Sequence, residues 1–311
     1  MLSFRRLATT SMVATILLVA IGGLVRATDS GLGCGDDWPD CNGKLIPVLN
    51  ARPVIIEWTH RAVAMVVGLL VLALFVHALR ELRDRPGLVR LSGAALGLVI
   101  FQGLLGRVVV VGELEVLLVV GHLATAMVFL AALIGLVGAS ARAGGSIAGN
   151  TDPAIARLAA WAAAAVLVLL VVGSYTSDYG YMPGWPFQQG RIIPNLGTER
   201  EAVHFLHRVL AVVVAIIVVW VAVQIRRRTS HDRVRQLALV AAALFFAEII
   251  IGAMNVWTVL NPIVVMFHLA AGAGVWASLV GIVAVASPAV GHIGATRDAH
   301  ATSTAALEPG R

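Results

Sequence analysis

The sequence predicts an all-α protein that crosses a membrane eight times, with its helices grouped as two four-helix bundles related by a pseudo-twofold axis. Three observations lead to this prediction: an apolar composition, eight apolar segments of spanning length, and an internal repeat. Of the 311 residues, 59% are hydrophobic and only 13% are charged, and the mean hydropathy is +0.89. Such values are typical of a chain that lies mostly in lipid.

The apolar segments define the predicted helices. A helix needs about 20 apolar residues to cross a bilayer. The segments that meet this requirement are 8–26, 54–79, 88–110, 116–139, 154–174, 200–225, 236–257 and 262–287. The first has no small-residue cleavage site after it, so we expect it to be retained as a span rather than removed as a signal peptide.

Charged residues divide the connections between spans into two sets. One set and the N-terminus are basic, with Arg5, Arg6, Arg80, Arg83, Arg85, Arg90, Arg142, Arg157, Arg226, Arg227, Arg228, Arg233 and Arg235. The other set holds Asp29, Asp36, Asp37, Asp40, Glu113, Glu115, Asp178 and Glu199. Basic connections stay in the cytoplasm. We therefore expect a multi-pass plasma-membrane protein surrounded by lipid, with both termini cytoplasmic and the cysteine-containing loop outside. The net charge of +6 then reflects orientation and not nucleic-acid binding.

An internal repeat relates the two halves of the chain. THRAVA at 59–64 aligns with LHRVLA at 206–211, and GHLA at 121–124 aligns with FHLA at 267–270. An even number of spans in each half gives both halves the same orientation, as in parallel-repeat membrane proteins. The predicted domains are an N-terminal bundle (1–145), a C-terminal bundle (146–290) and a disordered cytoplasmic tail (291–311).

Four histidines lie at matched depth in the predicted spans. They are His60, His122, His207 and His268, each six or seven residues from the outer end of its span, or about 10 Å deep at 1.5 Å per residue. One imidazole on each face of a flat macrocycle makes haem iron six-coordinate, and bundles hold cofactors from facing helices. Zinc or copper would favour three or four converging ligands. A proton relay would favour histidines spread across the membrane, and a lone histidine is most often a helix–helix hydrogen bonder. The matched pairs favour haem.

The halves differ at a few polar positions. Glu57, one helical turn outward of His60, is replaced by His204 in the second half, and Gln102 is replaced by Glu248. The two cysteines, Cys34 and Cys41, have no counterpart. These differences predict one reactive site and one electron-transfer site.

The chain resembles the haem A synthase family over about 8–287. The resemblance rests on GLVRATDSGLGC at 23–34, DWPDCNG at 37–43 and EWTHR at 57–61. It implies an oxidoreductase that converts the C8 methyl of haem O to a formyl group by successive hydroxylations, giving haem A for terminal oxidases. It also implies haem O as substrate, haem b as cofactor, and haem O synthase and an electron acceptor as partners, and it allows a homo-oligomer.

The resemblance also assigns roles to individual residues. His60 and His122 would hold the substrate haem, His207 and His268 would ligate haem b, and Glu57 would be catalytic. Cys34 and Cys41 would form a disulfide when oxidised. The second cysteine pair that some relatives carry in a later outer loop is absent from 175–199, so any role of that pair does not apply here.

Physical arguments support some of these roles and leave others open. Oxidation of a methyl group builds positive charge, which a carboxylate such as Glu57 stabilises or whose proton it accepts. Arg26, Arg61 and Arg208 lie near the outer interface, where they either pair with haem propionates or simply extend to the surface. A Cys34–Cys41 bond closes a small loop worth roughly 2–3 kcal/mol, so a structural role and a redox role are both open.

Two other functions fit the repeat and the histidines. One is a dihaem b-type electron carrier that takes electrons from quinol, and the other is a haem carrier without redox chemistry. Glu57, the cysteine loop and the difference between the halves favour the haem-modifying enzyme.

Overall fold

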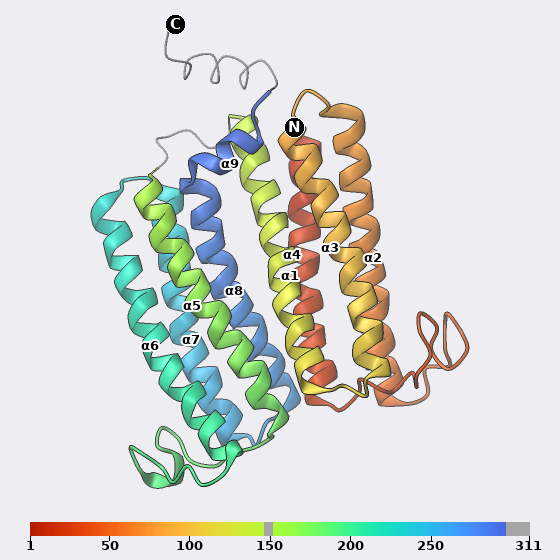
Figure 1. The fold of residues 1–311 in the computed structure, drawn as a ribbon, viewed down its shortest axis with the longest axis vertical. Coiled ribbons are helices and arrows are strands. Elements are labelled where there is room, and N and C mark those ends of the chain that lie inside the picture. Colours follow the sequence, from red (N-terminus) through yellow and green to blue (C-terminus); the bar gives the residue numbers. More distant parts are fainter. Residues whose placement is uncertain (146–151, 297–311) are drawn as a thin grey trace, which may run out of the picture.

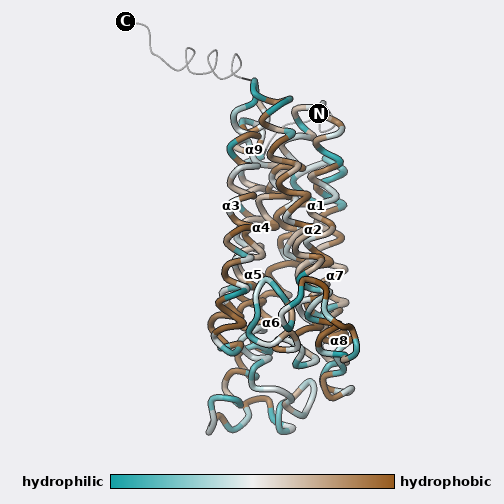
Figure 2. Tube along the Cα trace, turned by 90° about the vertical axis from the view of Figure 1, so that its right-hand side faces the viewer, coloured by the Kyte–Doolittle hydropathy of each residue, from teal (hydrophilic) through white to brown (hydrophobic). Residues whose placement is uncertain are grey.

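The computed structural model describes residues 1–145 and 152–296, and within these ranges the regular structure is helical. The eight predicted spans are confirmed, because eight of the helices are long and apolar enough to cross a membrane. They are α1 (Leu2–Ala27), α2 (Arg52–Glu81), α3 (Pro86–Val111), α4 (Val116–Ala143), α5 (Pro153–Asp178), α6 (Glu199–Arg228), α7 (Asp232–Trp257) and α8 (Pro262–Ala286). The helices are apolar through most of their length and more polar at both ends (Figure 2).

Most helices run beyond the predicted apolar segments. The largest difference is at α1, which begins at Leu2 and includes Arg5 and Arg6. A helix can extend past the hydrocarbon boundary because its backbone hydrogen bonds are kept there and water solvates the polar side chains of the added turn. Hydropathy therefore marks the lipid-embedded part of a helix and not its ends.

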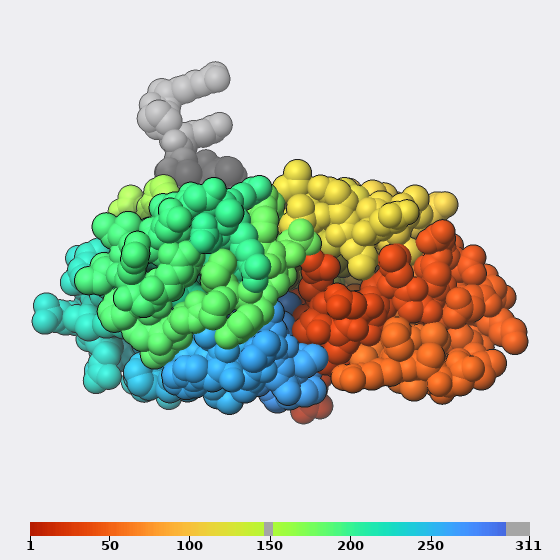
Figure 3. All heavy atoms as spheres, turned by 90° about the horizontal axis from the view of Figure 1, so that it is seen from below, coloured from red at the N-terminus to blue at the C-terminus, as the bar shows by residue number. Residues whose placement is uncertain are grey.

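The eight helices form two rings of four. In the first ring α1 packs on α2 and α4, and α3 packs on the same two helices. In the second ring α5 packs on α6 and α8, and α7 packs on both of them. The rings lie side by side, in the same helix order, with the long loops of both at one end of the molecule (Figures 1 and 3). Helices α1 and α4 of the first ring contact α8 of the second, and α4 also contacts α5.

The repeat extends to the conformation of the short turns. Glu113 and Leu114, between α3 and α4, have φ of 52° and 63°, and Val259 and Leu260, between α7 and α8, have φ of 53° and 59°. Positive φ is uncommon in residues other than glycine. Its occurrence at equivalent positions of both halves supports a common origin for the two rings.

The packed core of each ring lies at the end away from the long loops. In α2 the buried positions after Glu57 begin only at Val67, and in α6 the first buried residue is Val214. The histidines His60 and His207 therefore lie outward of the packed core. Tightly packed interiors leave little space for a ligand, so we expect a ligand of either ring to lie on the long-loop side of the packed core.

Beyond α8 the chain forms a short helix, α9 (Pro288–Ile293), which packs against α3 and α4. Gly294, just after it, accepts a hydrogen bond from Arg85. The sequence predicts a disordered tail over 291–311, but its first residues belong to α9 and pack against the N-terminal ring. The rest of that tail, and the residues just after the predicted domain boundary at 145/146, lie outside the described residues.

Candidate functional site

The four predicted ligand histidines form two pairs. His60 and His207 each lie eight residues after the first residue of α2 and α6, and His122 and His268 each lie six residues after the first residue of α4 and α8. Helices α2 and α4 are diagonal in their ring, as are α6 and α8 in theirs. The imidazoles of each pair are close enough to interact electrostatically across the bundle. The structure therefore brings His60 to His122 and His207 to His268.

A glycine on the preceding helix lies against each of these imidazoles. The pairs are Gly22 and His60, Gly106 and His122, Gly173 and His207, and Gly252 and His268. A Cβ at these glycines would lie 3.2, 3.5, 3.0 and 3.3 Å from the respective imidazole Cε1. At Gly106 this distance is an ordinary van der Waals contact, and at the other three positions it is shorter than one. The absence of a side chain at each glycine thus lets the neighbouring imidazole lie close to the preceding helix, away from the other histidine of its pair.

The two sites fit a flat metal macrocycle. The Nδ1 atoms of His60, His122, His207 and His268 are buried and have no hydrogen-bond partner within residues 1–145 and 152–296, although Nδ1 of His268 forms an ion pair with Glu248. With Nδ1 enclosed by protein, Nε2 is the nitrogen left to bind a metal. Among the described residues, no group of three or more His, Cys, Asp or Glu side chains is placed to hold a metal ion. Two opposed imidazoles, rather than a three- or four-ligand cluster, are what haem iron requires.

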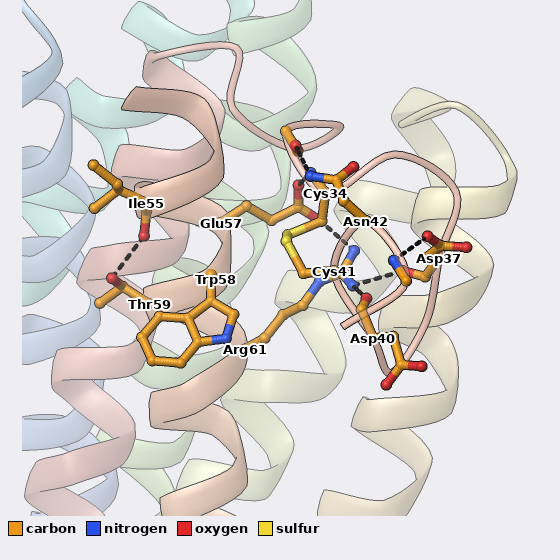
Figure 4. Close-up of a disulfide and its surroundings, with 12 residues drawn as sticks. Cys34, Asp37, Asp40, Cys41, Asn42, Ile55, Glu57, Trp58, Thr59 and Arg61 are labelled. Atoms are coloured by element: carbon orange, nitrogen blue, oxygen red, sulfur yellow. Dashed lines mark hydrogen bonds and ion pairs between the residues drawn. A yellow bond between two sulfur atoms is a disulfide. The ribbon is translucent and has the colours of Figure 1, made fainter. Parts of the chain in front are cut away.

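The carboxylate predicted to be catalytic lies under the cysteine loop. Glu57 is only 3% exposed, and its Oε2 accepts a hydrogen bond from the backbone N–H of Cys34 at 2.8 Å. Its Oε1 is paired with Arg61, one turn further along α2. Figure 4 shows this arrangement, with the carboxylate between the loop and the arginine. Glu57 thus connects the helix that carries His60 with the loop that covers it. The catalytic role of Glu57 stays a prediction.

The arginines predicted to contact propionates have protein partners in the structure. Arg61 donates from Nη1 to the carbonyl oxygens of Asp37 and Asp40, at 2.7 and 2.6 Å. Arg208 donates to the carbonyl of Gly184 at 2.6 Å, in the equivalent loop of the second half. Both arginines therefore hold an outer loop against the helix that carries a histidine.

Arg26 differs from the other two, because it forms an ion pair with Asp178, which joins the outer ends of α1 and α5. Whether any of the three arginines also reaches a propionate stays a prediction.

The cysteines are bonded to each other, as the resemblance implied. The Cys34–Cys41 disulfide is enclosed, with the two residues 0% and 1% exposed, and it packs against Val54 and Trp58. A disulfide in this position supports a small apolar cluster above α2. Its redox role stays a prediction.

Sequence reasoning missed two features of these sites. One is the set of glycines beside the imidazoles, although Gly106 and Gly252 occupy matching positions of the repeat and so carried a detectable signal. The other is the partner of Glu248. Its replacement of Gln102 was visible in the sequence, but its contact with the Nδ1 of His268 was not.

The fold and the sites define a class: a multi-pass membrane protein made of two equivalent four-helix rings, each with a pair of histidines on diagonal helices near its long-loop end. Residues 5–280 match the family COX15-CtaA, described as cytochrome oxidase assembly protein. The chain belongs to this family.

Individual relatives cover most of the chain. It is 31% identical over 292 residues to a protein from Symbiobacterium thermophilum named heme A synthase, covering 90% of this chain and 94% of that one. It is 28% identical over 277 residues to a heme A synthase from Lysinibacillus sphaericus, covering 84% and 88%. A Thermus thermophilus protein named protoheme IX farnesyltransferase is 29% identical over 283 residues, but the match covers 84% of this chain and only 45% of that longer relative.

Proposed function

We propose that this protein is a haem A synthase, an oxidoreductase that converts the C8 methyl of haem O to a formyl group by successive hydroxylations and loss of water. The observation that carries the proposal is the unequal pair of sites. Both rings have two facing histidines beside two glycines, and only the first has a carboxylate, Glu57, one turn outward of a histidine. Membership of the family and the names of its relatives point the same way.

The N-terminal ring is the proposed substrate site. His60 and His122 would hold the iron of haem O, and Gly22 and Gly106 would let the imidazoles lie flat against their helices. Glu57 would lie beside the edge of the porphyrin, where a carboxylate stabilises positive charge that develops at the methyl carbon or accepts its proton. The Cys34 N–H and Arg61 would keep the carboxylate oriented until the substrate competes for it.

The C-terminal ring is the proposed electron-transfer site. His207 and His268 would hold a permanent haem b, which when bound supplies a one-electron carrier between the substrate site and an external acceptor. In this ring His204 takes the place of Glu57, so there is no acidic group at the matching position to act on a methyl group. Two domains with different tasks, 1–145 and 146–290, follow from this assignment.

Orientation and partners complete the proposal. The basic connections support an orientation with both termini in the cytoplasm and the Cys34–Cys41 loop outside. We also propose haem O synthase as a partner, because the Thermus relative is about twice the matched length and bears the name of a farnesyltransferase. In a chain that combines a farnesyltransferase with a region similar to this protein, the product of the first could pass directly to the second.

Expression in a host that makes haem O but lacks its own haem A synthase tests the proposal. We expect haem A, or haem O with a hydroxylated C8 methyl, in haems extracted from membranes and identified by mass. A protein that binds haem but yields neither product would be a dihaem electron carrier instead. The electron carrier is the alternative because both rings share the same arrangement of histidines and glycines.

A further inference from the structure

The two halves treat one of their histidines differently. In the second half, Oε2 of Glu248 on α7 forms an ion pair with Nδ1 of His268 on α8. Glu248 is only 9% exposed. Neither of its oxygens, nor Nδ1 of His268, has a hydrogen-bond partner among the described residues, so the contact between them is the ion pair. A buried carboxylate within a membrane span is costly unless it binds something. His268 Nδ1 is what it binds.

The equivalent residue in the first half does something else. Gln102 donates from Nε2 to the backbone carbonyl of His122 at 3.0 Å, and its Oε1 accepts from the hydroxyl of Thr125 at 3.2 Å. Its side chain thus binds the backbone of α4 and leaves the imidazole of His122 alone. Nδ1 of His122 is buried and without a hydrogen-bond partner in the described chain.

Neighbouring substitutions make room for the change. The position of Thr125 is occupied in the second half by Ala271, which removes the hydroxyl that binds Gln102. The position of Ala126 is occupied by Gly272, where a Cβ would lie only 3.1 Å from Oε1 of Glu248. Three positions therefore change together, and the combined effect is to let a carboxylate reach the histidine ring.

We infer that Glu248 is a positioning residue for the axial ligand His268 and that it lowers the reduction potential of the haem held by His207 and His268. The inference rests on the proposed function, which places a haem there. A carboxylate beside Nδ1 favours the tautomer that has its proton on Nδ1 and leaves Nε2 free, and it makes the imidazole a stronger donor. A stronger donor stabilises ferric over ferrous iron, and hydrogen bonding to the axial ligand is one way that a protein sets a haem potential.

The first half, with no carboxylate on either histidine, lacks this effect. Electrons that leave the substrate haem for an acceptor would then pass through a site whose potential Glu248 lowers. The conservative change Glu248→Gln keeps the shape of the side chain and removes its negative charge.

The test is a potentiometric titration of the full-length protein, purified with haem b from a host that makes no haem O. In Glu248→Gln we expect the ratio of reduced to oxidised haem at a fixed potential to rise about tenfold, which for a one-electron couple is about 59 mV. The low-spin ferric electron paramagnetic resonance signal should shift toward that of neutral imidazole ligands. Gln102→Glu, the reciprocal change in the other ring, should leave the potential of this haem unchanged.

The possible results separate the inference from the proposed function. Haem retained with an unchanged potential in Glu248→Gln would overturn the role of Glu248 while leaving the haem site intact. If Glu248→Gln loses haem, Glu248→Asp decides: recovery of bound haem supports a carboxylate that positions the ligand, and loss in both variants overturns it. If His207→Ala leaves the haem spectrum of the parent protein unchanged, the assignment of haem b to this ring fails instead.

Discussion

Glu57 and Cys34 are joined by a hydrogen bond from the Cys34 backbone N–H to the Glu57 carboxylate, 2.8 Å long and enclosed by protein. The bond links a helix that carries a predicted haem ligand to a disulfide loop 23 residues earlier in the chain. It also raises the question whether Glu57 serves the chemistry or only the loop.

Replacing Glu57 with glutamine separates these roles. The amide oxygen of glutamine still accepts the Cys34 N–H, so the loop should keep its place, but the negative charge is lost. We expect conversion of haem O to fall by about 10²- to 10⁴-fold, the range for loss of a general acid–base group, while the haem b spectrum stays the same. Product analysis by mass and optical spectra of the purified variant measure both. Wild-type conversion in Glu57→Gln would mean that Glu57 only anchors the loop.

The histidine pairs should respond independently to substitution. His207→Ala should remove the six-coordinate haem b spectrum, because one axial ligand is lost. His60→Ala should keep that spectrum and abolish conversion, since the substrate haem loses its ligand in the other ring. Optical spectra and haem extraction distinguish the two, and the reverse pattern would exchange the assignments of the rings.

The glycines beside the imidazoles give a graded prediction. Gly173→Ala, with a Cβ 3.0 Å from the His207 ring, should lower the haem b content more than Gly252→Ala at 3.3 Å. Gly121→Ala in the first ring is the control, because it adjoins His122 in sequence but its Cβ would have no atom within 4 Å apart from its chain neighbours and the backbone of its own helix. Haem-to-protein ratios of the purified variants provide the measurement. Equal haem content in all three would show that these glycines do not shape the site.

The disulfide should contribute to the stability of the outer loop more than to haem b binding. Changing Cys34 and Cys41 to serine removes a cross-link worth roughly 2–3 kcal/mol on the chain-entropy model. We expect faster proteolysis of the loop over 28–51 and an unchanged haem b spectrum. Arg61→Lys should have a similar effect on proteolysis, since lysine lacks the second nitrogen that lets Arg61 bind the carbonyls of Asp37 and Asp40 from Nη1 and Glu57 from Nη2. Wild-type proteolysis in the cysteine variant would exclude the structural role.

The sequence allowed the spans, the repeat and the histidine pairs to be predicted because lipid imposes strong rules on helix length and on buried polar groups. His60 and His207 are 147 residues apart, and His122 and His268 are 146 residues apart. The repeat identified both pairs because these two offsets nearly agree. Gly22 and Gly173 were not identified in this way, because their offset of 151 differs from the 147 of His60 and His207, and a motif of one glycine carries no signal alone.

The bonds of Arg61 and Arg208 were also beyond sequence reasoning. Both arginines donate to backbone carbonyls, and every residue has one, so no residue type at the acceptor position reveals the contact. The partner of Glu57 could not be predicted for the same reason, because it is the backbone N–H of Cys34 and not the cysteine side chain.

The packing of α1 against α8 has a consequence for synthesis of the protein. These are the first and last spans among the described residues, and a Cβ at Gly23 of α1 would lie 3.0 Å from Leu269 and 3.6 Å from Met266 of α8. The first ring has all its own helices once α4 is inserted, and domains generally fold as they are made, N-terminal first. Until α8 enters the membrane, the face of α1 that it covers must contact lipid or an assembly factor. The contacts of α1 and α4 with α8 therefore form last, after the contact between α4 and α5 that also joins the two rings.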